Sequence, residues 1–275
     1  MEQIKKIEYE IGPEKKLRLG LGELGRYGEL LYFFTWRDIK VKYKQTFLGF
    51  LWAVLQPLLM TVVFTLAFAN YQPHGNIPYP LFICSGFILW NIFASGISSA
   101  GNSMVSNANI IKKIYFPRLI IPVSSVLVAL FDFAMTIPLL VALLIYYKIC
   151  PSLVHIWMLP AGILLAIIST LGPGCLLAAL NVKYRDFRYV IPFVVQFLMF
   201  TTLFIFPQNL NHAGWLKEIF ALNPMAGAIA LFRGFITGEE VDFALCGISC
   251  ISAVVFFLLG IFVFRKTESY FADLA

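Results

Sequence analysis

One acidic residue stands where a charge is costly, and it is the first candidate for chemistry. Asp132, in the run LFDFAM, is the only acidic or basic side chain deep within a long apolar segment. A carboxylate inside a membrane is expensive and by default suggests a functional role. A proton relay or a membrane polymerase would be expected to have several such groups, and one is too few for either. We therefore interpret Asp132 as a packing group, protonated or hydrogen-bonded to a neighbouring helix, rather than a substrate contact.

The other patterns that could carry chemistry are weak. The run GLGELG, from Gly20 to Gly25, matches GxGxxG, but no strand precedes it and no βαβ unit surrounds it. No GxxxxGK[ST] motif occurs, so the chain has no phosphate-cradling loop of its own. The five cysteines lack metal-ligand spacing, and the three histidines are scattered among connecting segments. We predict no catalytic residue, no metal site and no cofactor bound by this chain.

The composition instead indicates a membrane. Of the 275 residues, 60% are hydrophobic and only 13% are charged, and the mean hydropathy is +0.81. Such values are typical of a polytopic membrane protein. The net charge of +6 could suggest a nucleic-acid partner, but an unequal distribution of basic residues across a membrane explains it better. Residues 1–28 form a basic arm without an apolar signal region, so we expect the first span to act as the signal.

Six apolar runs are long enough to cross a bilayer or nearly so. They are Leu48 to Asn70, Tyr79 to Gly101, Leu119 to Tyr147, Leu153 to Leu180, Val190 to Phe206 and Phe243 to Phe264. An even number puts both termini on one side. With both termini in the cytoplasm, the inner segments hold 18 Lys or Arg and the outer segments hold three. The positive-inside rule therefore predicts cytoplasmic termini.

The segment 29–47 precedes the first span and predicts an amphipathic helix. On a helix, Tyr32, Trp36, Ile39, Tyr43 and Phe47 form one aromatic stripe, with a basic stripe of Arg37, Lys40 and Lys44 beside it. Rings facing the acyl boundary and cations facing phosphates suit the headgroup layer. We predict that this helix lies on the membrane, and that residues 48–275 form the six-span domain.

Two connecting segments stand out. Residues 106–122 lie on the cytoplasmic side, where Pro117 favours a short helix, near Asn109 to Tyr115, that stops at Phe116. After the fifth span, Trp215 to Leu222 and Pro224 to Phe235 read as two short helices. Neither is long enough to cross a hydrocarbon core of about 30 Å. We predict a re-entrant helical hairpin at the outer face, bordering a pathway.

Five stretches, in order, resemble the membrane-spanning subunit of type-2 ABC exporters that move polysaccharides such as O-antigen, capsule and teichoic acid. They are WRDIKVKYKQTFLGFLWAVLQPLL from Trp36, NIIKKIYFPRLIIP from Asn109, NVKYRDFRYVIPF from Asn181, ALNPMAGAIALFRG from Ala221, and ESYFADLA from Glu268. The resemblance runs from about residue 30 to the end, and the first two stretches are fairly specific. Residues 1–28 lie outside it, and their role stays open.

The resemblance implies a homodimer around a central channel in the bacterial inner membrane, with two separate ATPase subunits that bind ATP and Mg. In that family, the amphipathic helix and the loop between spans two and three contact the ATPases. By resemblance, the coupling residues here are Trp36, Arg37, Lys40, Asn109, Lys112, Lys113, Tyr115, Phe116 and Arg118. The outer hairpin acts as an exit gate in the family, which maps to Trp215, Asn223, Pro224, Met225 and Arg233. We expect Tyr115 and Phe116 to be anchors in a pocket of the partner.

Two aromatic stripes are candidates for the channel wall. They are Phe47, Phe50, Phe64 and Phe68 before and along the first span, and Phe193, Phe197, Phe200 and Phe204 on the fifth. Aromatic faces suit the C–H edges of sugars, and an uncharged wall lets a long lipid-linked chain slide. Lipid-facing phenylalanine is the alternative for any single ring. Two other functions stay open: a permease of the same superfamily for drugs or lipids, and a membrane enzyme of lipid-linked sugar metabolism.

Overall fold

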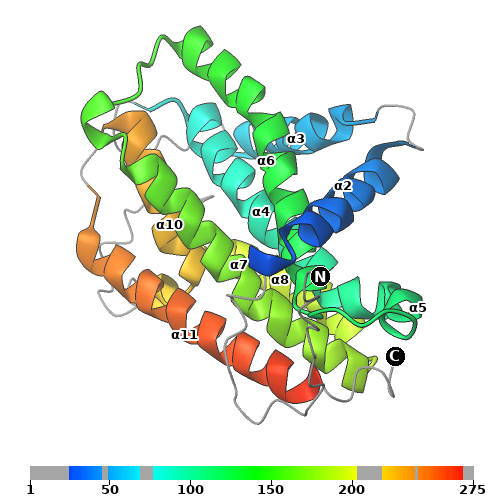
Figure 1. Cartoon of the computed structure of the whole chain (residues 1–275). Coiled ribbons are helices and arrows are strands. Elements are labelled where there is room, and N and C mark those ends of the chain that lie inside the picture. Colours follow the sequence, from blue (N-terminus) through cyan, green and yellow to red (C-terminus); the bar gives the residue numbers. More distant parts are fainter. Residues whose placement is uncertain (1–24, 45–48, 69–76, 203–218, 239–240, 269–275) are drawn as a thin grey trace, which may run out of the picture.

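The computed structural model describes residues 25–44, 49–68, 77–202, 219–238 and 241–268. Within these ranges every regular element is helical, as Figure 1 shows. The α-helices are α2 (Gly28–Lys44), α3 (Leu51–Ala67), α4 (Tyr79–Ser106), α5 (Ala108–Ile111), α6 (Ile120–Tyr147), α7 (Met158–Lys183), α8 (Phe187–Thr201), α10 (Pro224–Thr237) and α11 (Phe243–Glu268), and a 3-10 turn, η1 (Leu153–His155), precedes α7.

Four helices are long and apolar enough to cross a membrane: α4, α6, α7 and α11. With 26 to 28 residues each, and about 1.5 Å of rise per residue, they exceed a hydrocarbon core of about 30 Å. Three apolar helices are shorter, namely α3, α8 and α10. The predicted first and fifth spans coincide with α3 and α8, and their outer portions lie outside the described residues. The chain is thus an all-helical membrane protein.

The predicted ends of the helices agree best with the structure where a long apolar run alone defines the helix. Helix α6 matches the predicted third span to within one residue at its start. The fourth span was predicted to begin at Leu153, but α7 begins at Met158 because the backbone first makes the 3-10 turn η1. The predicted helix from Asn109 to Tyr115 is wrong in extent, since α5 ends at Ile111 and residues 114–117 have no regular structure.

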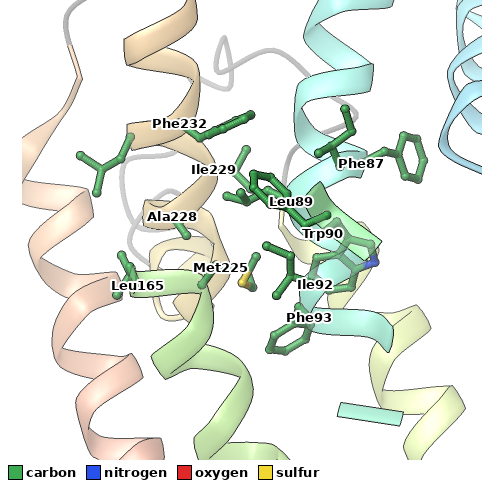
Figure 2. Packing of buried hydrophobic residues seen from close by; sticks show 14 of the residues in the cluster. Phe87, Leu89, Trp90, Ile92, Phe93, Leu165, Met225, Ala228, Ile229 and Phe232 are labelled. Atoms are coloured by element: carbon green, nitrogen blue, oxygen red, sulfur yellow. The ribbon is translucent and has the colours of Figure 1, made fainter. Parts of the chain in front are cut away.

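Helix α4 lies at the centre of the core. Its buried residues run from Tyr79 to Met104, and it packs against α6 and α7. Figure 2 shows Phe93 of α4 close to Met225 of α10, with Leu165 of α7 and Phe232 of α10 in the same cluster. These side chains are buried against protein, so α4, α7 and α10 pack around one core.

Helices α7 and α11 lie side by side along their length (Figure 1) and meet at two glycines. A Cβ added at Gly172 would collide with the backbone of Phe256 and Phe257, and one added at Gly260 would collide with the backbone of Gly172. At these two positions there is room for the glycine hydrogen atom but not for a larger side chain. The seam formed by Gly172 and Gly260 therefore sets a backbone-to-backbone contact of the kind that holds helices together in lipid.

Candidate functional site

The two predicted coupling segments pack against each other. The Phe34 ring of α2 lies 5.5 Å from the Phe116 ring, centroid to centroid, just ahead of α6. The Arg37 guanidinium lies 4.7 Å from the centroid of the Phe34 ring. Its Nη2 also donates a hydrogen bond of 2.8 Å to Oδ1 of Asn107, between α4 and α5. These contacts join α2 and the loop between α4 and α6 into one structural unit.

Adjacent aromatic residues of the loop have opposite environments. The side chain of Tyr115 is 94% exposed, whereas that of Phe116 is 5% exposed. Phe116 belongs to a buried cluster that also contains Phe34 and Ile120. Of the two rings expected to enter a partner's pocket, the structure offers Tyr115, because Phe116 is already enclosed by its own chain.

The exposed surfaces of the loop and of α2 are each basic and aromatic. Lys112, Lys113 and Asn109 are exposed on the loop. On α2 the rings of Tyr32 and Trp36 stack with 6.4 Å between centroids, and Nζ of Lys40 lies 5.3 Å from the Trp36 ring centroid. Tyr32 and Trp36 stay largely exposed, and the one buried residue of α2 is Phe34, outside the predicted aromatic stripe.

Arg118 ties the start of α6 to the end of α11. Its backbone N–H donates to Oε1 of Glu268 at 3.2 Å, and its guanidinium donates to the backbone oxygen of the same residue. Glu268 Oε2 also accepts a hydrogen bond of 2.8 Å from Nη1 of Arg265. Arg118, predicted to contact an ATPase, thus has an intramolecular role in binding the two helix ends together.

Asp132 is held by α2 and α4. Its carboxylate, 4% exposed, accepts hydrogen bonds from Nζ of Lys42 and from the hydroxyl of Tyr43, both on α2. The hydroxyl of Ser95 on α4 lies 3.5 Å from Oδ2. Burial and the hydrogen bond to Asp132 raise the pKa of the Tyr43 phenol, so the phenol keeps its proton and donates. The prediction that Asp132 is hydrogen-bonded to a neighbouring helix agrees with this geometry.

The two phenylalanine stripes differ in exposure. Phe64 is half-buried and lies 5.4 Å from Phe87 of α4, ring to ring, and 6.1 Å from Phe68. These two rings pack on the core of their own chain, while Phe50 is exposed. On α8, Phe193, Phe197 and Phe200 are all more than half exposed on one face. Phe47 and Phe204, which complete the predicted stripes, lie outside the described residues.

Helix α10 begins at a buried asparagine. Oδ1 of Asn223 accepts a hydrogen bond of 3.1 Å from the N–H of Met225, which caps the helix, and Pro224 occupies the first turn as predicted. Nδ2 of Asn223 donates to Thr202 Oγ1 at 2.7 Å and to the Leu198 carbonyl oxygen at 3.2 Å. One side chain therefore caps α10 and binds it to the end of α8.

Further along α10, Arg233 binds the N-terminal end of α4. Its guanidinium lies 3.6 Å from the centroid of the Phe82 ring, and Nη2 donates a hydrogen bond of 2.8 Å to the Phe82 carbonyl oxygen. Its Nε lies 3.4 Å from Ser85 Oγ. Trp215, which the sequence also assigned to the outer gate, lies outside the described residues.

Serines of α11 satisfy the backbone where α10 begins. Ser249 Oγ donates to the Ala221 carbonyl oxygen at 2.8 Å and accepts from the Gly227 N–H at 3.1 Å. Ser252 Oγ donates to the Leu222 carbonyl oxygen at 2.6 Å. Backbone groups that leave a helix at membrane depth need such partners, because lipid offers none.

Sequence reasoning missed Phe34, Lys42 and Asn107 as functional partners. Phe34 follows Leu30 by four residues, and this spacing predicts a second apolar face on α2. Lys42 also carried a signal, since an acidic side chain within a span calls for a cation nearby. Asn107 carried none, because its role depends on where Arg37 lies in three dimensions.

Comparison with known proteins gives consistent matches over most of the chain. The model of the family described as ABC-2 type transporter matches residues 29–237. An O-antigen export system permease, RfbA, of Klebsiella pneumoniae is 29% identical over 253 residues, which cover 91% of this chain and 96% of that protein. RfbA of Myxococcus xanthus is 28% identical over 251 residues, covering 90% and 96%. A capsule polysaccharide export inner-membrane protein, CtrC, of Neisseria meningitidis is 25% identical over 217 residues, covering 74% and 78%.

Proposed function

The chain belongs to the ABC-2 type transporter family, and on that premise we propose that it is the channel-forming membrane subunit of an exporter of lipid-linked polysaccharide. The observation that carries the proposal is the share of each chain that the alignments cover. Two O-antigen export permeases align with at least 90% of this chain and 96% of their own lengths. A likeness that leaves almost no segment unmatched on either side favours one shared task over a shared fold alone.

The chain itself supplies the passage, and a separate ATPase supplies the energy. The sequence has no GxxxxGK[ST] loop, so ATP and Mg would bind to the partner subunit. Two surfaces suit that partner: the basic, aromatic face of α2 with Tyr32, Trp36 and Lys40, and the exposed tip at Tyr115. Exposed aromatic rings flanked by lysines are typical anchors of a protein interface.

The full topology has six spans, with both termini in the cytoplasm of a bacterial cell and the protein in its inner membrane. Helices α3 and α8 are the first and fifth spans, and the distribution of 18 inner against three outer basic residues supports the orientation. Helix α10 is the outward half of a re-entrant hairpin. Its first turn accepts a hydrogen bond from Ser169, in the middle of α7, and near its end Phe235 accepts one from Ser152, ahead of α7.

Two copies of the chain enclose the channel. The exposed face of α8, with Phe193, Phe197 and Phe200, is the part of the wall that stays available for a sugar chain or a second copy. Phe64 and Phe68 contribute to the wall only indirectly, by fixing α3 on α4. An uncharged aromatic lining provides weak contacts in many registers, which a sliding polymer requires.

The test measures export in cells and identifies what remains bound to the purified chain. A strain that lacks the gene should accumulate lipid-linked glycan in the cytoplasm and regain surface glycan when the chain is restored. The tagged chain, purified from membranes, should retain an ABC ATPase and the lipid-linked glycan. Turnover of a sugar substrate by the purified chain without a partner would instead support a membrane enzyme. Retention of a drug or a simple lipid, with normal surface glycan in the deletion strain, would overturn the polysaccharide assignment.

A further inference from the structure

The interaction of Asp132 with α2 joins two parts of the chain that hydropathy alone would separate. Asp132 is the thirteenth residue of α6, about 18 Å along the helix from Ile120. That distance places the carboxylate near the middle of the 28-residue helix. Its partners, Lys42 and Tyr43, come from the last turn of α2, a helix that is not itself a span. The end of the amphipathic helix therefore reaches the interior of a membrane helix.

Helix α2 is attached to the rest of the chain at two points, near its middle and at its C-terminal end. Near its middle, Phe34 and Arg37 bind the loop ahead of α6. Nine residues after Phe34, or about 13 Å along a helix, Tyr43 binds Asp132, and its ring lies 6.2 Å from that of Phe131. Two separated attachment points prevent α2 from pivoting relative to α6. A displacement applied to α2 from the cytoplasm must then move α6 as well.

The charge pair between Lys42 and Asp132, at the second attachment point, suits a contact that fixes one alignment of α2 and α6. Asp132 is buried, whereas the side chain of Lys42 is 42% exposed. Such a charge pair adds little net stability over an apolar pair of similar shape, because desolvation of the carboxylate offsets the attraction. Removing Lys42, however, leaves the buried charge of Asp132 uncompensated. Such a pair specifies one alignment of two helices more than it strengthens their contact. Along the described length of α6, Asp132 is the only residue that can accept such a partner, since no other side chain of that helix is charged.

We propose that Asp132 is a positioning residue that locks the end of α2 onto α6, so that movement imposed on α2 at the cytoplasmic face is transmitted to the interior of the channel. The proposal rests on the proposed function, since the movement would come from the ATPase. It assigns Lys42 and Tyr43 as the other half of the lock. Ser95 adds a weaker contact from α4, which extends the connection to the central helix of the core.

The first test is a double-mutant cycle on the purified membrane subunit alone. Lys42→Met should leave the carboxylate of Asp132 without its cation and lower the thermal midpoint by about 5 °C or more. Adding Asp132→Asn to Lys42→Met should recover most of that loss, because no buried charge remains. Lys44→Met removes an exposed lysine from the same turn and should change the midpoint by less than about 2 °C. Losses that simply add in the double variant would refute the pair.

The second test measures transmission in the complete exporter. The Lys42→Met/Asp132→Asn variant, assembled with its ATPase, should keep the basal rate of ATP hydrolysis but lose export by about tenfold. A merely structural pair predicts normal export, because the double variant is stable. The measurements on the membrane subunit alone need no substrate, so they stay informative if the chain exports something other than polysaccharide.

Covalent replacement of the lock provides the sharpest outcome. In a background without the five native cysteines, Tyr43→Cys and Phe131→Cys can be joined by a short thiol-reactive crosslinker in the uncoupled double variant. If attachment of α2 to α6 is what matters, crosslinking should restore export. Crosslinking that proceeds efficiently without any recovery of export would overturn the proposal.

Discussion

Two segments that look alike in sequence have opposite environments in the molecule. Each is a short, mostly apolar run that ends at a proline: Ile114 to Phe116 precede Pro117, and Ala221 to Asn223 precede Pro224. Before Pro117 the backbone has no regular structure and Tyr115 projects almost fully into solvent. At Pro224 the buried Asn223 caps α10 at once, and the helix is enclosed by α4, α7 and α11.

The difference shows which kind of element can receive a partner. An exposed ring held by a short loop is available for binding, whereas a capped and buried helix is already committed to the core of its own chain. A moving outer gate built on α10 must therefore break specific hydrogen bonds, in addition to shifting apolar contacts. The cytoplasmic tip can respond to a partner without breaking any of the interactions described for α10.

The strongest expected effect comes from crosslinking the outer half-helices of two copies. Ala226 and Ala230 are the half-exposed positions on α10 between Met225 and Leu231, whereas Ile229 is 2% exposed. In a cysteine-free background, Ala230→Cys should crosslink between copies and abolish export if the hairpins meet and part at the symmetry axis. Reduction should restore export.

Ile229→Cys is the matched control for that crosslink, because it lies beside Ala230 but faces the core. It should not crosslink. Normal export by a fully crosslinked Ala230→Cys pair would show that α10 is static and that the gate lies elsewhere.

The next largest effect separates the neighbouring rings of the cytoplasmic loop. Phe116→Ala removes a buried ring that packs on Phe34, and we expect a loss of about 3 kcal/mol in the free energy of unfolding. Tyr115→Ala removes an exposed ring and should leave stability unchanged. It should instead weaken binding of the ATPase by about thirtyfold, equivalent to about 2 kcal/mol. Thermal unfolding and partner titration together measure both quantities. A Tyr115→Ala variant that binds its ATPase normally would move the docking site to Trp36 and Lys40.

Replacing the cap of α10 should have a smaller effect on stability. Asn223→Ala removes the cap and leaves the Met225 N–H without its acceptor, and it removes the donor to Thr202. We expect a loss of about 2 kcal/mol, from the cap and the buried hydrogen bonds together. Asn109→Ala, at an exposed position, is the control for the same chemical change. Equal thermal midpoints for the two variants would contradict the claim that Asn223 binds α10 to α8.

The smallest effect concerns the outer end of α10. Arg233→Gln loses the guanidinium stacked on Phe82 and the charge-assisted hydrogen bond to its carbonyl oxygen. The expected loss is about 1 kcal/mol in unfolding free energy, because the arginine is only partly buried. Arg188→Gln, at an exposed position near the start of α8, should have no measurable effect. If both variants unfold like the unmodified chain, Arg233 does not stabilise the contact between α10 and α4.

The parts of the fold that depend on local pattern were predictable. Hydropathy located α6 to within a residue, and the Asn223-Pro224 pair located the start of α10. The cytoplasmic loop was not predictable to the same degree, because a segment without a helical or strand period does not say which of two adjacent rings is buried. Tyr115 and Phe116 have similar size and sequence context, and only the position of Phe34 decides between them.

The helices and loops that form the candidate site were predictable from the sequence, but the contacts between their side chains were not. The amphipathic helix, the loop and the half-helix were all expected from spacing. That Lys42 would reach Asp132 requires knowing that α2 lies along α6. That placement involves contacts, such as the one between Phe34 and Phe116, between segments far apart in the sequence. The phenylalanine stripe of α3 shows the same limit. The helical spacing predicted which rings share a face, but it did not predict that Phe64 and Phe68 would pack on the core of their own chain.

The glycine seam between α7 and α11 has a consequence for how the protein is made. Helix α11 emerges from the ribosome last among the long helices and must find its place against α7, which is already in the bilayer. Lipid tails compete well for ordinary apolar faces, but they cannot fill the space where Gly172 and Gly260 bring two backbones together. The seam therefore favours the docked position of α11 over contact with lipid. We expect a methyl group at position 260 to leave α11 inserted but undocked from α7.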